Sequence, residues 1–490
     1  MNDRHDLELV LQSRIPIVAL ETREERRAME LLRSLMLTSG QRLFRWTVTE
    51  GMISVVHGLG LQSETVEPAA ALLQIKNDKK EGVYVLVDFH PWLDDPVHVR
   101  LLKDIAIQYE QYGQTIVLLS HHLDIPPELS HYCASVSLNL PDSDKIASIV
   151  RETAVAWSRE HAGQRVRADK SILDKLVRNL AGLTVAEVRR LAKRVIYDDG
   201  AINADDLPRL LKAKYELLNR DGVLQYEYDT EEFSQIGGFA HLRKWLAQRK
   251  NSFQNENRIL DRPKGLLLLG VQGCGKSLAA KATAGDWGLP LLRLDVGSLF
   301  NKFHGETERN LRETLKAAEA MSPCVLWIDE IEKGFSVSAN DNGTSKRVLG
   351  TLLTWMAENK EAVFLVATAN DIDALPPELI RKGRMDEIFF VDLPDLSARR
   401  HIFEIHLRRR EQDPIHFSLA ELARKSKGFS GAEIEQVVVS ALYSAQAQSS
   451  RLSDELIAEE IAQTRPLSVL MGEKIKRLRD WAESRTVSAN

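Results

Sequence analysis

The sequence predicts an α/β protein with a phosphate-binding loop in its second half, and two observations lead to this prediction. Short apolar runs typical of buried strands alternate with amphipathic helical patterns along the 490-residue chain. One of these runs, residues 266–269, leads into a glycine-rich loop, and a helical pattern follows from Lys281. A strand, a glycine loop and a helix in this order form the setting in which backbone amides bind phosphate.

The composition is that of an ordinary globular protein, with 44% hydrophobic and 28% charged residues. The net charge of −5 provides no basic footprint for nucleic acid or for a membrane surface. No apolar run approaches the ~18 residues of a membrane span, and the polar start leads into no signal-like core. Cys133, Cys274 and Cys324 show neither metal nor disulfide spacing, so we expect a cytoplasmic protein.

Residues 1–215 are expected to form a first module. Apolar runs at residues 15–20, 83–88 and 115–120 predict strands of a parallel sheet, and the last third of the module has a helical pattern. Residues 216–232, which are rich in Asp, Glu and Tyr, are expected to connect this module to the next.

The first module is interpreted as a degenerate copy of the second. Four short stretches correspond in the same order: 85–88 with 326–329, 126–129 with 376–379, 140–142 with 393–395, and 182–188 with 428–434. In the first copy the initial strand runs into Glu21 and Thr22 without a glycine cradle, and Phe89 stands where Glu330 stands in the second. The module is therefore not expected to bind nucleotide. An unrelated α/β domain with coincidental matches is the alternative.

The glycine-rich loop has the pattern G-x-x-x-x-G-K-[ST]. It consists of Gly270, Val271, Gln272, Gly273, Cys274, Gly275, Lys276 and Ser277, with Leu278 next. We expect Lys276 to reach the β- and γ-phosphates of ATP and Ser277 to ligate Mg²⁺. A chance glycine turn is the alternative, and the polar residues that follow in the chain count against it.

The further polar groups that ATP hydrolysis requires follow the loop in the expected order along the chain. The apolar run 325–328 ends in Asp329, expected to hold Mg²⁺ through water, and in Glu330, expected to orient and polarise the attacking water. Asn370 ends the next buried run and could position the same water, although such a residue alone is equally typical of a turn.

Two arginines, Arg381 and Arg384, lie three positions apart in a predicted loop. Their spacing suits stabilisation of phosphoryl-transfer charge in a neighbouring subunit, and a solvated basic turn is the alternative.

Taken together, these motifs resemble the classical clade of AAA+ ATPases, the group of katanin, spastin and the vacuolar-sorting AAA ATPases. The resemblance covers residues 233–490, and the chain is most similar to an AAA family also encoded in cyanobacterial and algal plastid genomes. It implies a P-loop AAA+ fold, with a large ATP-binding subdomain over residues 233–395 and a helical lid with a C-terminal helix over 396–490. It also implies homo-oligomeric, hexameric rings with ATP sites between subunits.

The resemblance implies roles residue by residue. Lys276 and Ser277 match Walker A, Asp329 and Glu330 match Walker B, Asn370 matches sensor 1, Arg381 and Arg384 match the paired arginine fingers, Gly237 and Gly238 match the adenine-side backbone contact, and Gly431 and Ala432 stand where a sensor-2 arginine occurs in some relatives.

Val271, Gln272 and Cys274 replace the usual residues of the Walker A loop, but at backbone positions, so function should persist. Cys274 lies among inward-pointing amides beside Lys276, which favours a thiolate and would allow redox gating. A small loop residue without a redox role is the alternative.

Lys302, Phe303, His304 and Gly305 resemble the first pore loop of AAA translocases. An exposed aromatic ring on a glycine-hinged loop can wedge between side chains of an extended polypeptide. Phe303 as an ordinary core residue is the alternative.

We therefore expect an ATPase that remodels or unfolds protein substrates. A nucleotide-dependent assembly switch or scaffold is the alternative from another class, and the acidic charge balance disfavours a DNA-handling protein.

Overall fold

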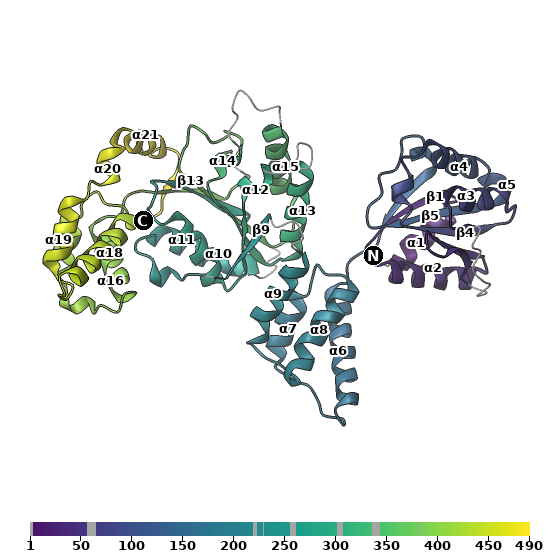
Figure 1. Ribbon diagram of the computed structural model, residues 1–490, viewed down its shortest axis with the longest axis horizontal. Coiled ribbons are helices and arrows are strands. Elements are labelled where there is room, and N and C mark those ends of the chain that lie inside the picture. Colours follow the sequence, from purple (N-terminus) through teal and green to yellow (C-terminus); the bar gives the residue numbers. More distant parts are fainter. Residues whose placement is uncertain are drawn as a thin grey trace. The chain divides into compact units, whose positions relative to one another are not determined.

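A computed structural model describes residues 3–55, 65–218, 223–228, 230–254, 261–300, 307–335, 344–381 and 383–490 (Figure 1). The chain divides into two compact units. The first holds Met1–Thr153 and Leu183–Ala192, and the second holds Ala154–Gly182 and Lys193–Asn490. Each unit is built around its own sheet, as the alternating apolar runs predict.

The first unit contains a six-stranded sheet in the order β3-β2-β4-β5-β1-β6. Its strands are β1 (Ile17–Glu21), β2 (Leu43–Thr47), β3 (Gly51–Ser54), β4 (Gly82–Val87), β5 (Gln114–Ser120) and β6 (Cys133–Ser137). All neighbouring strands are parallel except β2 and β3, which form an antiparallel pair. β4 and β5 are buried along their whole length, which explains their continuous apolar sequences.

Helices cover both faces of this sheet (Figure 1). The helices of this part of the chain are α1 (Asp3–Gln12), α2 (Glu25–Ser39), α3 (Pro68–Asn77), α4 (Pro96–Ile107) and α5 (Tyr109–Tyr112). Apolar residues of α1 and α2 pack with one face of the strands, and those of α3 and α4 pack with the opposite face. The alternation of side chains along each strand divides the core into these two layers.

Four helices follow in the sequence, as the helical pattern there predicts: α6 (Ser143–Glu160), α7 (Lys170–Asn179), α8 (Val185–Asp199) and α9 (Asp206–Leu218). Two short strands, β7 (Arg167–Ala168) and β8 (Ala201–Ile202), pair in parallel beside them. Leu211, Tyr215 and Leu218 of α9 pack against the core of the second unit. This helix therefore contributes to the second unit, although its sequence lies in the first predicted module.

The second unit contains a seven-stranded sheet in the order β15-β14-β10-β13-β12-β11-β9. Its strands are β9 (Leu224–Glu227), β10 (Gly265–Gly270), β11 (Leu291–Leu294), β12 (Cys324–Ile328), β13 (Val363–Ala369), β14 (Glu387–Val391) and β15 (Val487–Ser488). Only β9 is antiparallel to its neighbour, β11. The expected connector, residues 216–232, thus includes an edge strand, whose Leu224 side chain is buried in the core.

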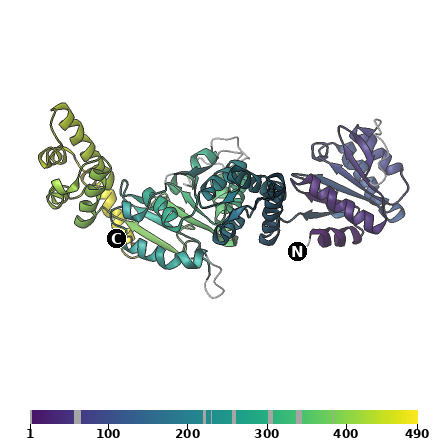
Figure 2. The ribbon, with the colours of Figure 1, turned by 90° about the horizontal axis from the view of Figure 1, so that it is seen from below.

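Helices of the second unit enclose the sheet and extend beyond it (Figures 1 and 2). They are α10 (Ala240–Gln254), α11 (Lys276–Trp287), α12 (Val296–Phe300), α13 (Thr307–Ala320), α14 (Ile331–Phe335), α15 (Thr344–Glu358), α16 (Leu396–Arg408), α17 (Leu419–Lys425), α18 (Gly431–Ala447), α19 (Asp454–Gln463), α20 (Leu467–Leu470) and α21 (Gly472–Ala482). Helices α16 to α19 share a separate apolar cluster and form the helical lid. Among the described residues, no helix has the length and apolar character needed to span a bilayer.

Five parallel strands have the same arrangement in the two sheets. Numbered along the chain, they are β1, β2, β4, β5 and β6 in the first sheet and β10 to β14 in the second, where the short strand β15 adds a sixth parallel strand beside β14. In both sheets the spatial order is fifth, first, fourth, third, second, and an antiparallel edge strand lies beside the second. The α/β prediction is therefore confirmed, and the shared order is what a degenerate copy would have.

Candidate nucleotide-binding site

The glycine-rich loop joins the end of β10 to the start of α11. A Cβ atom on Gly270 would lie 2.0 Å from the carbonyl oxygen of Val391, so a side chain cannot fit there. Gly273 and Gly275 have φ angles of 75° and 89°, which other residues adopt only with strain. The loop therefore requires these glycines, and the amino end of α11 lies where a phosphate can meet its free amides.

Lys276 is the first residue of α11 and is buried. Its Nζ donates hydrogen bonds to the carbonyl oxygens of Gly270, at 2.9 Å, and Val271, at 2.8 Å. Burial lowers the pKa of Lys276 to about 8, although nearby acidic side chains oppose the shift. A phosphate bound in the loop would add negative charge next to this ammonium.

Asp329 lies at the carboxyl end of β12, where three side chains converge on its carboxylate. Ser277 Oγ lies 3.3 Å from Oδ1, Thr368 Oγ1 donates to Oδ1 at 2.7 Å, and Arg293 Nη2 donates to Oδ2 at 3.4 Å. A hydroxyl and a carboxylate at this separation are the hard oxygen ligands that Mg²⁺ takes. The sequence prediction brought Ser277 and Asp329 together but missed Thr368 and Arg293. Thr368 lies on β13, two residues before Asn370, which follows that strand, and this spacing is the pattern that could have identified it.

Glu330 lies next to Asp329 and is held in a left-handed turn, with φ of 49°. Its backbone N–H donates to Thr368 Oγ1 at 3.0 Å, and its Oε1 accepts a hydrogen bond from Asn370 Nδ2 at 2.9 Å. The Lys333 ammonium also forms an ion pair with Glu330. The two residues predicted to act on water are therefore in direct contact.

Glu332 is a second carboxyl group at this site, and the sequence prediction missed it. Its Oε1 accepts a hydrogen bond from the Asn370 backbone N–H at 2.9 Å. Its Oε2 is buried and has no hydrogen-bond partner in the described part of the chain. Burial raises the pKa of Glu332. An acidic residue two positions after a catalytic one is too common on surfaces to identify such a group from sequence.

A pocket beside the loop brings together the predicted adenine-side residues. Its lining includes Gly237, Gly273, Ile402, His406 and Gly431, and so combines the start of the AAA module, the phosphate loop and the lid. A Cβ atom on Gly237 would lie 2.7 Å from Cγ1 of Ile402, and Gly238 has φ of 87°. Gly237 lines the pocket and needs a bare backbone, whereas Gly238 lies outside the lining and is a glycine because of its left-handed φ. The sequence prediction missed His406, which comes from the lid helix α16.

The lid contacts the phosphate loop through its backbone. Ala432 N–H, at the start of α18, donates to the carbonyl oxygen of Gly273 at 3.0 Å. Ser430 and Glu433 form a reciprocal capping box that fixes this end of the helix. Gly431 and Ala432 thus reach the loop with main-chain groups, since neither carries a polar side chain.

The expected thiolate at Cys274 is wrong. The side chain is buried, and burial raises its pKa to about 12. Lys276 opposes this shift, but the loss of solvation is the larger effect, and Asp392 and Glu433 add to it. A protonated thiol in this position is a packing residue rather than a reactive nucleophile.

Arg384 is not brought to the phosphate loop of its own chain. Asp386, two residues later, accepts hydrogen bonds from the backbone N–H groups of Lys264 and Gly265, at 2.7 and 2.9 Å, at the amino end of β10. The loop follows the carboxyl end of that strand, roughly 17 Å away at about 3.3 Å per residue. Nη1 of Arg384 is buried without a hydrogen-bond partner among the described residues, and Arg381 is exposed. Lys302, Phe303, His304 and Gly305 lie outside the described residues.

Comparison with protein families assigns four segments of the chain. The family of ATPases associated with various cellular activities (AAA) matches residues 266–393, and the AAA+ lid domain matches residues 416–456. The N-terminal domain of SpoVK-like AAA ATPases matches residues 3–138, and the second domain of the same group matches residues 144–221.

Related proteins match nearly the whole chain. The Uncharacterized AAA domain-containing protein ycf46 of Pyropia yezoensis is 36% identical over 98% of both chains, and that of Trieres chinensis is 36% identical over 99% of this chain and 97% of its own. The Proteasome-activating nucleotidase of Aeropyrum pernix is 38% identical over 73% of this chain and 84% of its own. With the phosphate loop, the lid and both N-terminal domains matched, the chain belongs to the ycf46 family of AAA ATPases.

Proposed function

We propose that the chain hydrolyses ATP in a homo-oligomeric AAA+ ring that remodels or unfolds protein substrates. One observation carries the hydrolysis step: the Thr368 hydroxyl links Asp329 and Glu330, and Asn370 bonds the Glu330 carboxylate. A chain that only bound nucleotide would not need the contact between Asn370 and the Glu330 carboxylate.

The roles follow from the positions of the side chains. Lys276 and the loop amides bind the phosphates, and Ser277 and Asp329 hold Mg²⁺, which when bound neutralises charge on the β- and γ-phosphates. Glu330 accepts a proton from the attacking water, and Asn370 holds the Glu330 carboxylate in position. The pocket that includes Gly237 and Gly431 takes the base.

Arg381 and Arg384 act on the site of a neighbouring subunit. The phosphate loop of their own chain lies at the opposite edge of the sheet, and Nη1 of Arg384 is buried with no hydrogen-bond partner in the described part of the chain. A hexameric ring would place each pair of arginines at the next ATP site. Arg384 in particular is then expected to find its partner only on assembly.

The remodelling role is supported by the similarity to the Proteasome-activating nucleotidase of Aeropyrum pernix, whose name connects a nucleotidase with the proteasome. An assembly switch without threading is the second candidate. The contact between Glu330 and Asn370 favours turnover over a switch. The pore-loop role of Phe303 and a cytoplasmic location stay predictions from the sequence.

The decisive variant is Glu330→Gln. Gln keeps the shape of Glu and its contact with Asn370 but cannot accept a proton, so ATP should bind with near-normal affinity while hydrolysis becomes very slow. Radiolabelled ATP retained on the protein and phosphate release measure the two steps. Lys276→Ala serves as the binding-deficient control.

The same variant tests threading. With ATP trapped, a ring that grips polypeptide should retain its substrate in a pulldown, whereas Glu330→Gln combined with Phe303→Ala should assemble but release it. Substrates retained equally by both proteins would favour the assembly switch. Unchanged hydrolysis in Glu330→Gln would overturn the assignment of the general base.

A further inference from the structure

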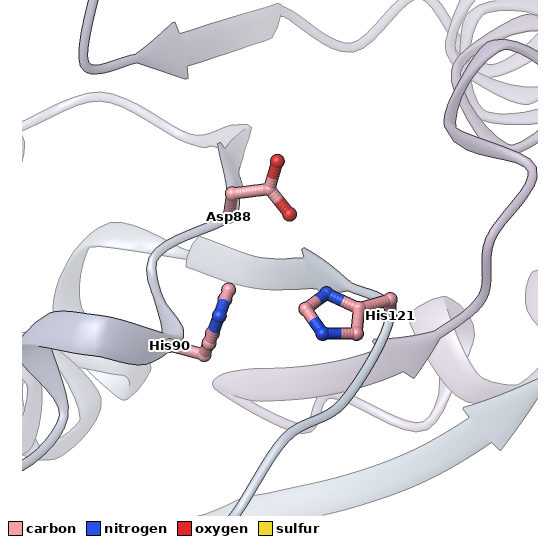
Figure 3. Close-up of side chains that lie close together, drawn as sticks. All are labelled: Asp88, His90 and His121. Atoms are coloured by element: carbon pink, nitrogen blue, oxygen red, sulfur yellow. The ribbon is translucent and has the colours of Figure 1, made fainter. Parts of the chain in front are cut away.

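A second cluster of polar side chains lies in the first unit, at the carboxyl edge of its sheet. Asp88 and His90 follow β4, and His121 follows β5. One oxygen of Asp88 and one ring nitrogen of each histidine all lie within 4.8 Å of one another. Figure 3 shows the carboxylate and the two imidazole rings projecting from two neighbouring segments into the same space. The imidazole rings are perpendicular, with centroids 4.9 Å apart.

A buried hydroxyl orients two of the three side chains. Ser120 is 3% exposed, and its Oγ donates to Asp88 Oδ1 at 3.3 Å and lies 2.8 Å from His90 Nδ1. When the hydroxyl donates its proton to Asp88, its oxygen accepts the N–H at Nδ1 of His90. That tautomer places the lone pair of His90 on Nε2, where it can ligate a metal. Oδ2 of Asp88 stays available as a second ligand atom.

The turn that carries Asp88 matches the turn that carries Glu330. Each follows the third parallel strand of its sheet, and the two residues have φ angles of 52° and 49°. Asp88 N–H bonds to Leu119 O and Glu330 N–H to Thr368 Oγ1, and both acceptors lie on the fourth parallel strand. The sequence comparison pairs Asp88 with Asp329 instead. That pairing is shifted by one residue. The residue with positive φ in the second unit is Glu330, not Asp329, so Asp88 corresponds to Glu330.

The two histidines match two other residues of the nucleotide site. His90 lies two positions after the left-handed residue, as Glu332 does in the second unit. His121 directly follows β5, as Asn370 directly follows β13. The three positions that hold two carboxylates and an amide in the second unit therefore hold a carboxylate and two imidazoles in the first, where a glycine cradle for phosphate is absent from the sequence.

We propose that Asp88, His90 and His121 bind a divalent transition metal ion of the Zn²⁺ type. Two imidazoles and one carboxylate suit such an ion and not Mg²⁺ or Ca²⁺, which take oxygen ligands. Ligand atoms on tetrahedral zinc lie about 3.4 Å from one another, so small rotations of the exposed Asp88 and His121 side chains close the site. Three protein ligands leave a fourth position for water or for a group of a bound partner.

Zn²⁺ binding to the full-length protein tests the proposal, by calorimetric titration in excess Mg²⁺ without nucleotide. Mg²⁺ occupies the oxygen ligands at Ser277 and Asp329 but does not compete for imidazole. We expect one equivalent of Zn²⁺ per chain. His121→Ala and Asp88→Asn should each weaken Zn²⁺ binding by at least about tenfold. Losing a residue that only hydrogen-bonds to a metal ligand already weakens binding by about this factor. Asn tolerates the left-handed backbone at position 88, so the fold should persist.

The matched control is His122→Ala. His122 is adjacent in sequence and partly exposed, but its ring nitrogens already contact Glu21, at 3.4 Å, and Asp124, at 3.2 Å. Its removal should leave the zinc affinity unchanged. With Co²⁺ as probe, the wild type and His122→Ala should show the visible absorption of a four-coordinate site, and His121→Ala should not. Equal Zn²⁺ binding by the wild type, Asp88→Asn and His121→Ala, or no binding by the wild type, would overturn the proposal.

Discussion

At the scale of single residues, the candidate nucleotide site depends on the Thr368 hydroxyl, which links Asp329 and Glu330. Thr368 is 1% exposed, donates to Asp329 and accepts from the Glu330 backbone. It therefore sets the separation of the Asp329 carboxylate, which we propose holds Mg²⁺, from Glu330, which we propose receives the proton. Asn370, two residues later and just past the end of β13, completes the network through Glu330.

Thr368→Val should keep ATP binding and slow hydrolysis. Val has the shape of Thr but neither donates to Asp329 nor accepts from Glu330 N–H. The unsatisfied amide is expected to lower the free energy of unfolding by about 1–3 kcal/mol. Phosphate release and urea denaturation measure the two effects.

Thr283→Val is the matched control for this change. Thr283 is equally buried, but its hydroxyl bonds only to the carbonyl oxygen of Ala279 within α11. It should lose little activity. Equal loss of hydrolysis in both variants would contradict a specific role for Thr368.

At the scale of elements, α9 is joined to the second unit through a buried lysine. Lys214 is fully buried, and its Nζ donates to the carbonyl oxygen of Ala181 at 2.6 Å. Burial lowers the pKa of Lys214 from 10.5 to about 7, and the nearby Cys324 thiol does not compensate. An uncompensated ammonium in this position is destabilising.

The position of Lys214 predicts a pH dependence of stability. The folded chain releases the Lys214 proton near pH 7, whereas the unfolded chain retains it to about pH 10. Because the unfolded state then binds more protons, the free energy of unfolding should rise with pH over this interval, by a few kcal/mol at most. Below about pH 7 both states are protonated and the contribution is constant.

Urea denaturation of the wild type and Lys214→Met from about pH 7 to about pH 10 measures this effect. The stability of the wild type should increase relative to that of the variant. Lys212→Met, an exposed lysine on the same helix, should follow the wild type. Parallel curves for the wild type and Lys214→Met would contradict the assigned pKa.

At the scale of the whole molecule, two sheets of the same strand order carry different chemistry at corresponding edges. The second sheet has a glycine cradle after β10, and in the first sheet β1 ends at Glu21, where the sequence has no such cradle. Arg384 lies at the opposite edge of the sheet from the phosphate loop, so it does not reach the loop of its own chain. The complete ATP site is therefore expected only in the assembled ring.

Arg381→Ala and Arg384→Ala should keep ATP binding but reduce hydrolysis, by about 10³-fold or more if they act as arginine fingers. Mixing either variant with Lys276→Ala subunits should restore some turnover, because hybrid interfaces combine an intact ATP site with intact arginines. Arg262→Ala is the control, since that guanidinium donates to the Lys360 carbonyl oxygen of its own chain. Loss of ATP binding within the mutated subunit would indicate a role in cis.

The sequence by itself determined the parts of the protein that depend on local pattern. The phosphate loop was recognisable because Gly270, Gly275 and Lys276 must occur at fixed spacing between a strand and a helix. Asp329, Glu330 and Asn370 were recognisable because each ends a buried apolar run, and parallel strands bring their carboxyl ends to one edge of a sheet.

Only the tertiary structure decided which further groups complete these sites. Glu332 and His406 are unremarkable in sequence, and Thr368 is marked only by its spacing from Asn370. All three acquire their contacts from strand pairing and from the lid. Cys274 was expected to be a thiolate from its neighbours along the chain, but desolvation, which depends on everything packed around it, dominates its pKa. The Asp88 cluster was missed for the same reason: His90 and His121 lie far apart in sequence and meet because β4 and β5 are adjacent.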